Sequence, residues 1–312
     1  MWNVIFMGTP DFAVPTLKAL IEKHEVLAVI SQPDKPKGRG KKLQPTPVKI
    51  AAEEAAGIPV YQPEKIKDEA FIATLKNIKA DVFVVVAYGQ ILPQAVLDMP
   101  KYGCINVHGS LLPKYRGAAP IQWAIINGEK VTGVTIMYME KGLDTGDMLL
   151  KREIPITPDD TYGSLHDKMA PVGAQALIEV LDMLENGTVS PEKQDDSISS
   201  YVSVINKSQG AIDWNGDAAD IVNLVHGLDP VPGAYSFLNG EMIKIWDAQL
   251  LEGFDGKAGS VVYTDKKKGF AVAAGKGAVL VKQMQAKGGK RMASADYMRG
   301  HEIKTGDMFE KE

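Results

Sequence analysis

The stretch Asn106-Val107-His108-Gly109-Ser110-Leu111-Leu112-Pro113 decides both the fold and the function expected of this 312-residue chain. It continues Gly103-Cys104-Ile105, an apolar run typical of a buried strand. Asn106 and His108 are two residues apart, so both side chains point to the same face of that strand. An amide and an imidazole on one face can hold a carbonyl oxygen and move a proton.

A carboxylate follows the next predicted strand, in Gly142-Leu143-Asp144-Thr145-Gly146-Asp147. Adjacent strand ends of a parallel sheet would bring Asp144 within reach of His108, where it can orient the imidazole and stabilise its charged form. Taken singly, a strand-end His or an Asp before Thr-Gly is more often structural. The joint placement favours catalysis. Because none of Asn106, His108 and Asp144 is a usual covalent nucleophile, the trio predicts transfer to an amine or water that the substrate supplies.

The composition is that of an ordinary globular protein, with 45% hydrophobic and 24% charged residues. No apolar run approaches the roughly 18 residues of a membrane span, and the N-terminus lacks the basic lead of a signal peptide. The single cysteine, Cys104, excludes an internal disulfide and a cysteine-rich zinc site, and we interpret it as a core residue. We expect a cytoplasmic protein without membrane contact or a metal site.

The charge distribution suggests a polyanionic partner despite a net charge of −4. Residues 35–49 contain six Lys and Arg and no acid, and residues 257–305 contain eleven against three acids. Such runs are usually solvated surface. Two separate basic segments in an acidic protein nevertheless predict a local polyanion-binding surface.

Alternation of strands and helices predicts the fold class of residues 1–188. Apolar runs predict strands at 2–7, 26–30, 82–87, 104–108 and 133–139, and helical spacing predicts helices at 10–23, 46–56, 68–78, 118–127 and 161–187. We therefore expect an α/β, Rossmann-like domain with a mostly parallel sheet and helices on both faces. The turn after the first strand contains only Gly8 of the three glycines of a dinucleotide site, which argues against nicotinamide.

The sequence changes character after this domain. Residues 189–206 are polar and interrupted by Pro191, and we interpret them as a linker. A helix at 218–228 and closely spaced strands then follow, at 234–238, 242–248, 259–263, 270–273 and 279–284. Short strands at this spacing predict a small, OB-like β-barrel domain over residues 207–312.

The signature stretches resemble those of the folate-dependent formyltransferases. Residues 106–120, which continue through Lys114-Tyr115-Arg116-Gly117-Ala118-Ala119-Pro120, are similar to the first signature of that superfamily, and residues 142–147 are similar to the second. Residues 6–12, 32–42 and 289–292 resemble further stretches of the branch that formylates methionyl initiator tRNA. The resemblance covers nearly the whole chain.

The resemblance implies formyl transfer from 10-formyltetrahydrofolate to the α-amine of methionine on initiator tRNA. Asn106 and His108 would stabilise the oxygen of the tetrahedral intermediate, and Asp144 would support His108. For folate we expect contacts from two segments: Ser110, Leu111, Leu112 and Pro113; and, through backbone groups, Tyr88, Gly89, Gln90, Ile91 and Leu92. For tRNA, the resemblance implies Arg39 as the main contact, with Lys41 and Lys42 beside it.

Three alternatives remain open at this point. A site of this superfamily can formylate a small nucleotide or sugar amine, and water can replace the amine and release formate. A tRNA-binding module with an inactive site is the third. The basic segments argue against a small amine, and the intact trio argues against an inactive site. His226 and Val231 replace a frequent Arg and a frequent Trp of the family, so no tRNA contact is assigned to residues 226–231.

Overall fold

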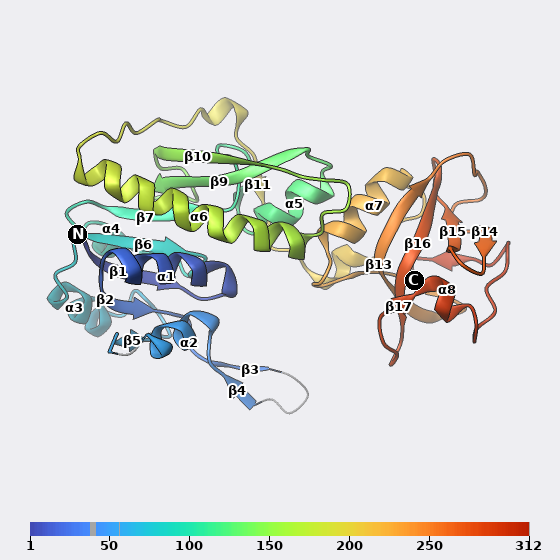
Figure 1. Ribbon diagram of the computed structural model, residues 1–312, viewed down its shortest axis with the longest axis horizontal. Helices are drawn as coiled ribbons and strands as arrows, with labels where there is room; N and C mark the ends of the chain where they lie inside the picture. The colour runs from blue at the N-terminus through green and yellow to red at the C-terminus, as the bar shows by residue number, and fades with distance from the viewer. Residues whose placement is uncertain (38–41, 56, 312) are drawn as a thin grey trace. The chain divides into compact units, whose positions relative to one another are not determined.

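The computed structural model describes residues 1–37, 42–55 and 57–311 and divides into two compact units (Figure 1). The first unit consists of residues 1–117, 132–155 and 166–201, and the second of residues 118–131, 156–165 and 202–312. Among the described helices, none is both long enough and apolar enough to cross a bilayer.

A seven-stranded sheet with the order β10-β9-β7-β6-β1-β2-β5 forms the centre of the first unit (Figure 1). Its strands are β1 (Asn3–Gly8), β2 (Glu25–Ile30), β5 (Val60–Tyr61), β6 (Val82–Val86), β7 (Cys104–His108), β9 (Val131–Tyr138) and β10 (Met148–Pro155). The five strands from β5 to β7 are parallel, whereas β9 is antiparallel to β7. The predicted fold class is therefore confirmed.

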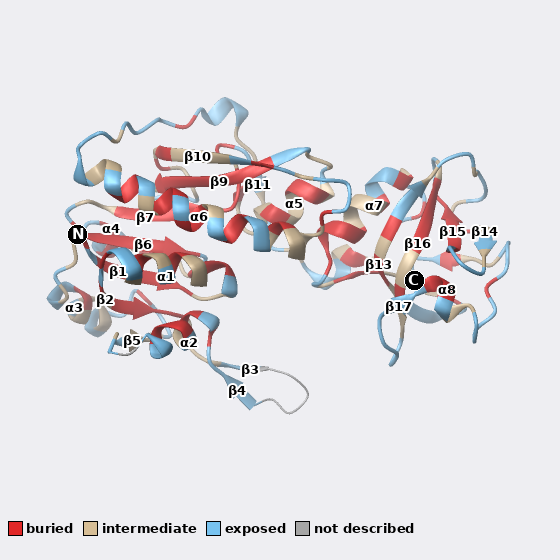
Figure 2. Ribbon diagram, in the orientation of Figure 1, coloured by how far each residue is buried: buried red, intermediate tan, exposed pale blue. Residues whose placement is uncertain are grey.

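Helices cover both faces of this sheet. They are the 3-10 turn η1 (Asp11–Ala13), α1 (Val14–Lys23), α2 (Pro47–Glu54), α3 (Glu69–Asn77), α4 (Gln94–Leu97) and α6 (Tyr162–Glu185). Phe83, Val85 and Cys104 share one buried cluster with Leu75 of α3 and with α4. On the other face, the backbone of α6 lies directly against β7, because a Cβ built on Gly173 would be 2.8 Å from Val107 Cγ1. Figure 2 shows the central strands buried along their length.

The differences from the predicted elements have local causes. The helix expected from residue 10 begins as the η1 turn, and α1 starts only at Val14. Thr46 precedes α2 as its N-cap, where its Oγ1 accepts a hydrogen bond from Lys49 N (3.2 Å). Strand β10 was not predicted because Lys151, Arg152 and Glu153 interrupt its apolar pattern. The short hairpin of β3 (Lys35–Lys37) and β4 (Lys42–Gln44) was not predicted either.

The second unit combines helices with an antiparallel sheet. Its helices are α5 (Pro120–Ile126), the 3-10 turn η3 (Lys207–Gly210), α7 (Ala218–Gly227) and α8 (Ser294–Tyr297). The sheet has the order β14-β15-β16-β13-β12-β18, with β17 on β16. Its strands are β12 (Ala234–Leu238), β13 (Glu241–Leu251), β14 (Val261–Asp265), β15 (Gly269–Ala273), β16 (Ala278–Ala286), β17 (Met292–Ala293) and β18 (Phe309–Glu310).

Hydrogen bonds join the two edges of this second sheet. Val261 N donates to Asp307 O (2.8 Å), and Phe309 N donates to Gly259 O (2.7 Å). The sheet therefore curls round until its edges meet, with Phe270 and Phe309 buried inside it and their stacked rings 5.5 Å apart between centroids. The barrel-like C-terminal fold is confirmed. Strands β17 and β18 were not predicted, because two residues are too few to show a pattern.

The sequence predicts that residues 189–206 are a linker. In the structure, this segment belongs to the first unit up to Tyr201. Glu192 forms a bridge with Met148 at the start of β10. The 3-10 turn η2 (Asp196–Ile198) comes next, and β11 (Tyr201–Val202) then pairs with β8 (Arg116–Gly117). The segment therefore makes specific hydrogen bonds with the loop that follows β7.

Gly133 tests the close contact between β9 and β10. A Cβ built there would be 2.0 Å from Arg152 O and 2.7 Å from Leu111 Cδ2. Since a strand oxygen cannot move aside without disturbing the sheet, Gly133→Ala should lower the free energy of unfolding by about 1–3 kcal/mol in urea titrations. The control Gly300→Ala, where a Cβ meets no atom within 4 Å, should change it by less than about 0.5 kcal/mol. Equal midpoints for the two variants would contradict this packing.

Candidate active site

Asn106 and His108 lie on the face of β7 that also carries Cys104, opposite the face that α6 covers. Both are buried, with 9% and 6% of their surface exposed. The predicted shared face is therefore confirmed. Within the described residues the Asn106 amide makes no hydrogen bond, so its donors remain available to a ligand. Cys104 is also buried, and burial raises the pKa of its thiol to about 12, which suits a core residue.

Among the described residues, one hydrogen bond holds the His108 ring. Its Nε2 lies 3.0 Å from the carbonyl oxygen of Tyr115. Because a carbonyl only accepts, this contact assigns the proton of the neutral ring to Nε2 and leaves a lone pair on Nδ1. Nδ1 lies 3.7 Å from Asp144 Oδ2, too far for a hydrogen bond but close enough to stabilise a positive ring.

Asp144 reaches His108 by a route that the sequence did not predict. Strand β9 is antiparallel to β7, and Met139 N donates to Cys104 O (2.8 Å), so β9 ends beside the start of β7. The loop 139–147 must therefore return along β7 to bring Asp144 to His108. The expected proximity of the two side chains is confirmed, whereas parallel strand ends were the wrong reason for it.

The loop from Ser110 to Pro113 is fixed by internal hydrogen bonds. Ser110 is fully buried, and its Oγ donates to Lys114 O (2.7 Å). Thr135 Oγ1 donates to Ser110 O (2.7 Å) and accepts from Leu112 N (3.1 Å). Ser110 is thus engaged within the protein, although the resemblance associates it with the folate site.

A small buried apolar cluster adjoins Asn106 on the same face of the sheet. Leu112 packs with Met137 and Met148, and Met137 is the register partner of Asn106. Leu111 is half-buried, whereas Pro113 is buried after a cis peptide bond from Leu112. Of these apolar residues, Leu111 is therefore the one with surface left for a ligand.

The segment 88–92 divides into core and surface residues. Tyr88 and Leu92 are buried in the cluster with α3 and α4. The Gln90 amide accepts from Ile66 N (2.7 Å) and donates toward the carbonyls of Pro63 and Glu64. Gly89 and Ile91 are exposed. Folate contact through this segment remains a prediction, restricted to backbone groups and Ile91.

The basic hairpin, formed by β3 and β4, flanks the segment expected to contact tRNA. Arg39 and Lys41 lie outside the described residues, and Lys42 is exposed at the start of β4. Asp34 anchors the base of the hairpin by accepting from Gln62 Nε2 (2.6 Å) and Lys49 Nζ (2.8 Å). The hydrogen bonds from Gln62 and Lys49 lower the pKa of Asp34, so this anchor is ionised at neutral pH.

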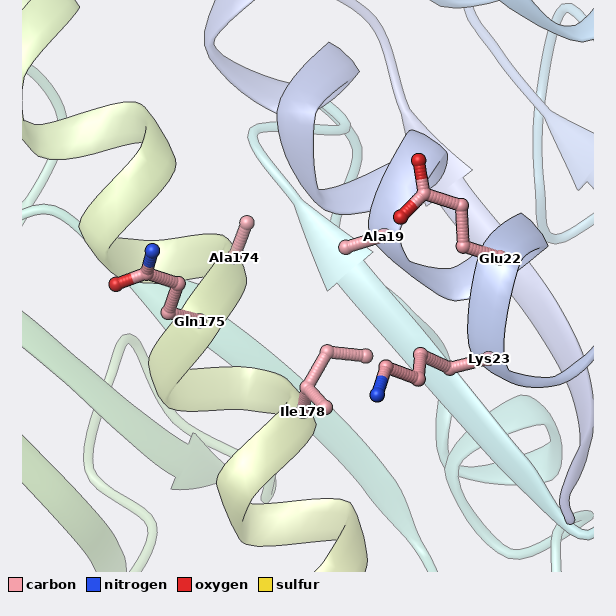
Figure 3. A pocket seen from close by; sticks show the side chains of 6 residues that line it. All are labelled: Ala19, Glu22, Lys23, Ala174, Gln175 and Ile178. Carbon is pink, nitrogen blue, oxygen red and sulfur yellow. The ribbon is translucent and has the colours of Figure 1, made fainter.

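Two further features carry no catalytic chemistry. The pocket in Figure 3 lies between α1 and α6, on the face of the sheet opposite Asn106, and is lined by Ala19, Glu22, Lys23, Ala174, Gln175 and Ile178.

His226 is buried, with Nε2 3.5 Å from Asp247 Oδ1, and Val231 is exposed. In the part of the chain that the structure describes, no three His, Cys, Asp or Glu residues form a metal-binding group.

Comparison with known proteins identifies the origin of this arrangement. The family model described as formyl transferase matches residues 2–181, and that of the formyl transferase C-terminal domain matches residues 204–302. A methionyl-tRNA formyltransferase of Lachnospira eligens is 50% identical over 314 residues, covering 98% of this chain and 99% of the relative.

Solved structures share the fold at low identity. The N-formyltransferase from Helicobacter canadensis, in complex with folinic acid and dTDP-3-aminofucose, has a TM-score of 0.67 at 22% identity and covers 90% of this chain and 99% of that one. HypX from Aquifex aeolicus, in complex with tetrahydrofolic acid, has a TM-score of 0.63 at 20% identity and covers 95% of this chain and 47% of that one.

A substitution at Tyr88 tests whether segment 88–92 divides into buried core residues and exposed surface residues. Its buried hydroxyl has no hydrogen-bond partner among the described residues, and burial raises its pKa from 10.0 to about 12. Removing it by Tyr88→Phe should raise the free energy of unfolding at pH 7 by up to about 1 kcal/mol. Because its pKa is higher in the folded state, the protonated Tyr88 hydroxyl contributes stability that is present below pH 10 and is lost as the pH rises from 10 to 12. The Tyr88→Phe variant should therefore lose less stability across this window than the wild type. Urea midpoints at pH 7 to 11.5 measure both effects. A lower midpoint at pH 7 would contradict the unpartnered hydroxyl.

Proposed function

The chain belongs to the formyl transferase family, and we propose that it transfers the formyl group of 10-formyltetrahydrofolate to the α-amine of methionyl initiator tRNA. The product, formylmethionyl-tRNA, serves translation initiation. The observation that carries the proposal is the sequence similarity to relatives that are named for this activity. It amounts to 50% identity over 98% of this chain and spans both units. The Asn106, His108 and Asp144 arrangement supplies the chemistry.

The chemical step needs an oxygen held and a proton moved. The neutral amine attacks the formyl carbon, a carbon–nitrogen bond forms, and the formyl oxygen gains negative charge. The free Asn106 amide is the donor for this oxygen. His108, which the resemblance implies as a second donor, has its Nε2 proton on Tyr115 O and acts as the base instead. His108 takes the amine proton at Nδ1, and Asp144 stabilises the positive ring that results. The proton then passes to the departing folate nitrogen as its bond to the formyl carbon breaks.

The residues around Asn106 suit a ring system with a polar edge. Leu112, Met137 and Met148 form a buried apolar cluster beside it, and Ser110, half-buried Leu111 and Pro113 lie in the loop that carries Leu112. Segment 88–92 follows β6, the strand next to β7, and its exposed residues Gly89 and Ile91 are accessible to a ligand. Folate supplies the activated formyl group, and holding it beside the amine supplies much of the rate. No metal is required.

For the tRNA we propose contact at the basic hairpin, with Arg39 as the main residue and Lys41 and Lys42 beside it. Lysines and arginines bind backbone phosphates and contribute affinity but little sequence information. Discrimination of the initiator then depends on how cheaply the first pair of the acceptor stem opens. We place this reaction in the cytoplasm, with the chain acting as a monomer.

One experiment tests the proposal. The chain is incubated with methionyl initiator tRNA and 10-formyltetrahydrofolate, and formylmethionine is measured after release from the tRNA. Parallel reactions contain a nucleotide-linked amino sugar or no acceptor. Formylmethionyl-tRNA is the expected product. Formylation of the sugar alone, or release of formate with no tRNA product, would refute the proposal.

The role of His108 gives the first functional prediction. His108→Ala should reduce the rate of formyl transfer by about 10²–10⁴-fold, because the group that accepts the amine proton is lost. Binding of tRNA and of folate to this variant, measured by filter retention and fluorescence, should stay within a few-fold of the wild type. Turnover near the wild-type rate would exclude His108 from the mechanism.

The role of the basic hairpin gives the second functional prediction. The triple variant Arg39→Ala, Lys41→Ala, Lys42→Ala should raise KM for tRNA at least about tenfold and leave KM for folate unchanged. The slope of log affinity against log salt should fall by about one unit per lost phosphate contact. Lys18→Ala, an exposed lysine of α1, is the control. Equal losses for tRNA and folate would mean that the hairpin is structural.

A further inference from the structure

We propose that Gln194 is a positioning residue of the formyl-transfer site. Its side-chain amide holds the backbone of the Asp144 loop, and Arg116 fixes the direction of that amide. The inference rests on the function proposed above, since it assigns a role within that reaction. Gln194 lies after α6, in the segment whose sequence suggests only a linker.

Gln194 contacts the loop on both sides of Thr145. It is buried, with 7% of its surface exposed. Its Nε2 donates to Asp144 O (2.8 Å) and to Gly146 O (2.8 Å), so both amide hydrogens are used on this one turn. A single side chain, 50 residues away in sequence, therefore fixes the backbone of the residue that carries the carboxylate.

Arg116 determines which way the Gln194 amide points. The Arg116 side chain is almost fully buried, and its Nε donates to Gln194 Oε1 (2.9 Å). A guanidinium only donates, so the amide oxygen must face Arg116 and the amide nitrogen must face the two carbonyls. Asp196 and Tyr201 bind the remaining guanidinium nitrogens, at 2.7 and 3.0 Å.

The Asp144 backbone needs such support. Its φ is +54°, in the left-handed region that residues with a side chain adopt infrequently and that persists where the surroundings impose it. Gly146 is required in the same turn, because a Cβ there would be 2.0 Å from Tyr138 O. Gln194 holds the Asp144 carbonyl, while Gly117 N donates to Asp144 Oδ2 (2.8 Å). The two contacts fix the backbone and the carboxylate separately.

The same segment also supports the loop that orients His108. Ser200 Oγ accepts from Tyr115 N (2.8 Å), and Ser200 O accepts from Arg116 N (2.8 Å). Tyr115 is the residue whose carbonyl holds His108 Nε2. Residues 194–200 thus bind both loops, one that presents Asp144 and one that orients His108.

Three variants test the inference. Gln194→Leu removes both donors, and Gln194→Glu keeps an oxygen toward Arg116 but turns a second oxygen toward the two carbonyls. Gln175→Leu makes the same change at an exposed glutamine of α6 and is the control (Figure 3). Each protein is assayed for formyl transfer to methionyl-tRNA, and its folded fraction is measured by thermal unfolding.

We expect kcat to fall about 10–100-fold in both Gln194 variants, because misplacement of a catalytic group by about 1 Å costs this much. KM for tRNA and for folate should stay within about threefold, since Gln194 is buried and its amide is engaged within the protein. Gln194→Glu should remain folded through its pair with Arg116, and it keeps the test valid where Gln194→Leu unfolds. Gln175→Leu should match the wild type.

The outcomes separate the two hypotheses. An active wild-type protein whose folded Gln194→Glu variant keeps kcat within twofold would overturn the positioning role and leave the proposed function intact. A rise in both KM values with unchanged kcat would overturn it as well. A wild-type protein that does not formylate methionyl-tRNA would overturn the proposed function and this inference together.

Discussion

The hydrogen bond between His108 Nε2 and the Tyr115 carbonyl is the contact on which the rest of the site depends. It places the ring proton on the side away from Asp144 and leaves Nδ1 as the only nitrogen that can accept another. The bond exists only because the chain after β7 turns back over its own strand end. Ser110 and Thr135 hold that turn through hydrogen bonds to backbone carbonyls, so the chemistry of one nitrogen is set by the folding of the loop that follows it.

The two halves of the site are positioned by different means. Asn106 and His108 take their direction from the pleat of β7, which is held between β6 and β9 and is buried on both faces. Asp144 sits on a loop and takes its direction from Gly117 N and Gln194. A strand fixes a side chain through many backbone hydrogen bonds, whereas a loop residue needs dedicated partners. The partners of Asp144 accordingly come from distant parts of the sequence.

The sequence predicted what depends on short-range pattern. The period of two placed Asn106 and His108 on one face, and continuous apolar runs located β1, β2, β6 and β7. Pairing direction has no such local signal, so β9 was expected to be parallel and the route to Asp144 was wrong. Charged strands such as β3 and β10 lack the apolar pattern. Gln194 stands in a polar, proline-interrupted stretch, where nothing local distinguishes a buried amide from a solvated one.

The choice of arginine at position 116 follows from the geometry that Gln194 requires. Burial alone would lower the pKa of Arg116, but its hydrogen bonds with Tyr201 and Asp196 raise the pKa above its ordinary value, so the group stays charged. A charged guanidinium offers donors in a rigid plane, and here they reach three separate acceptors at once. A lysine presents its donors from a single nitrogen and cannot span these positions. The fixed plane makes the direction of the Gln194 amide, and through it the conformation of Asp144, a property of the folded chain before any substrate arrives.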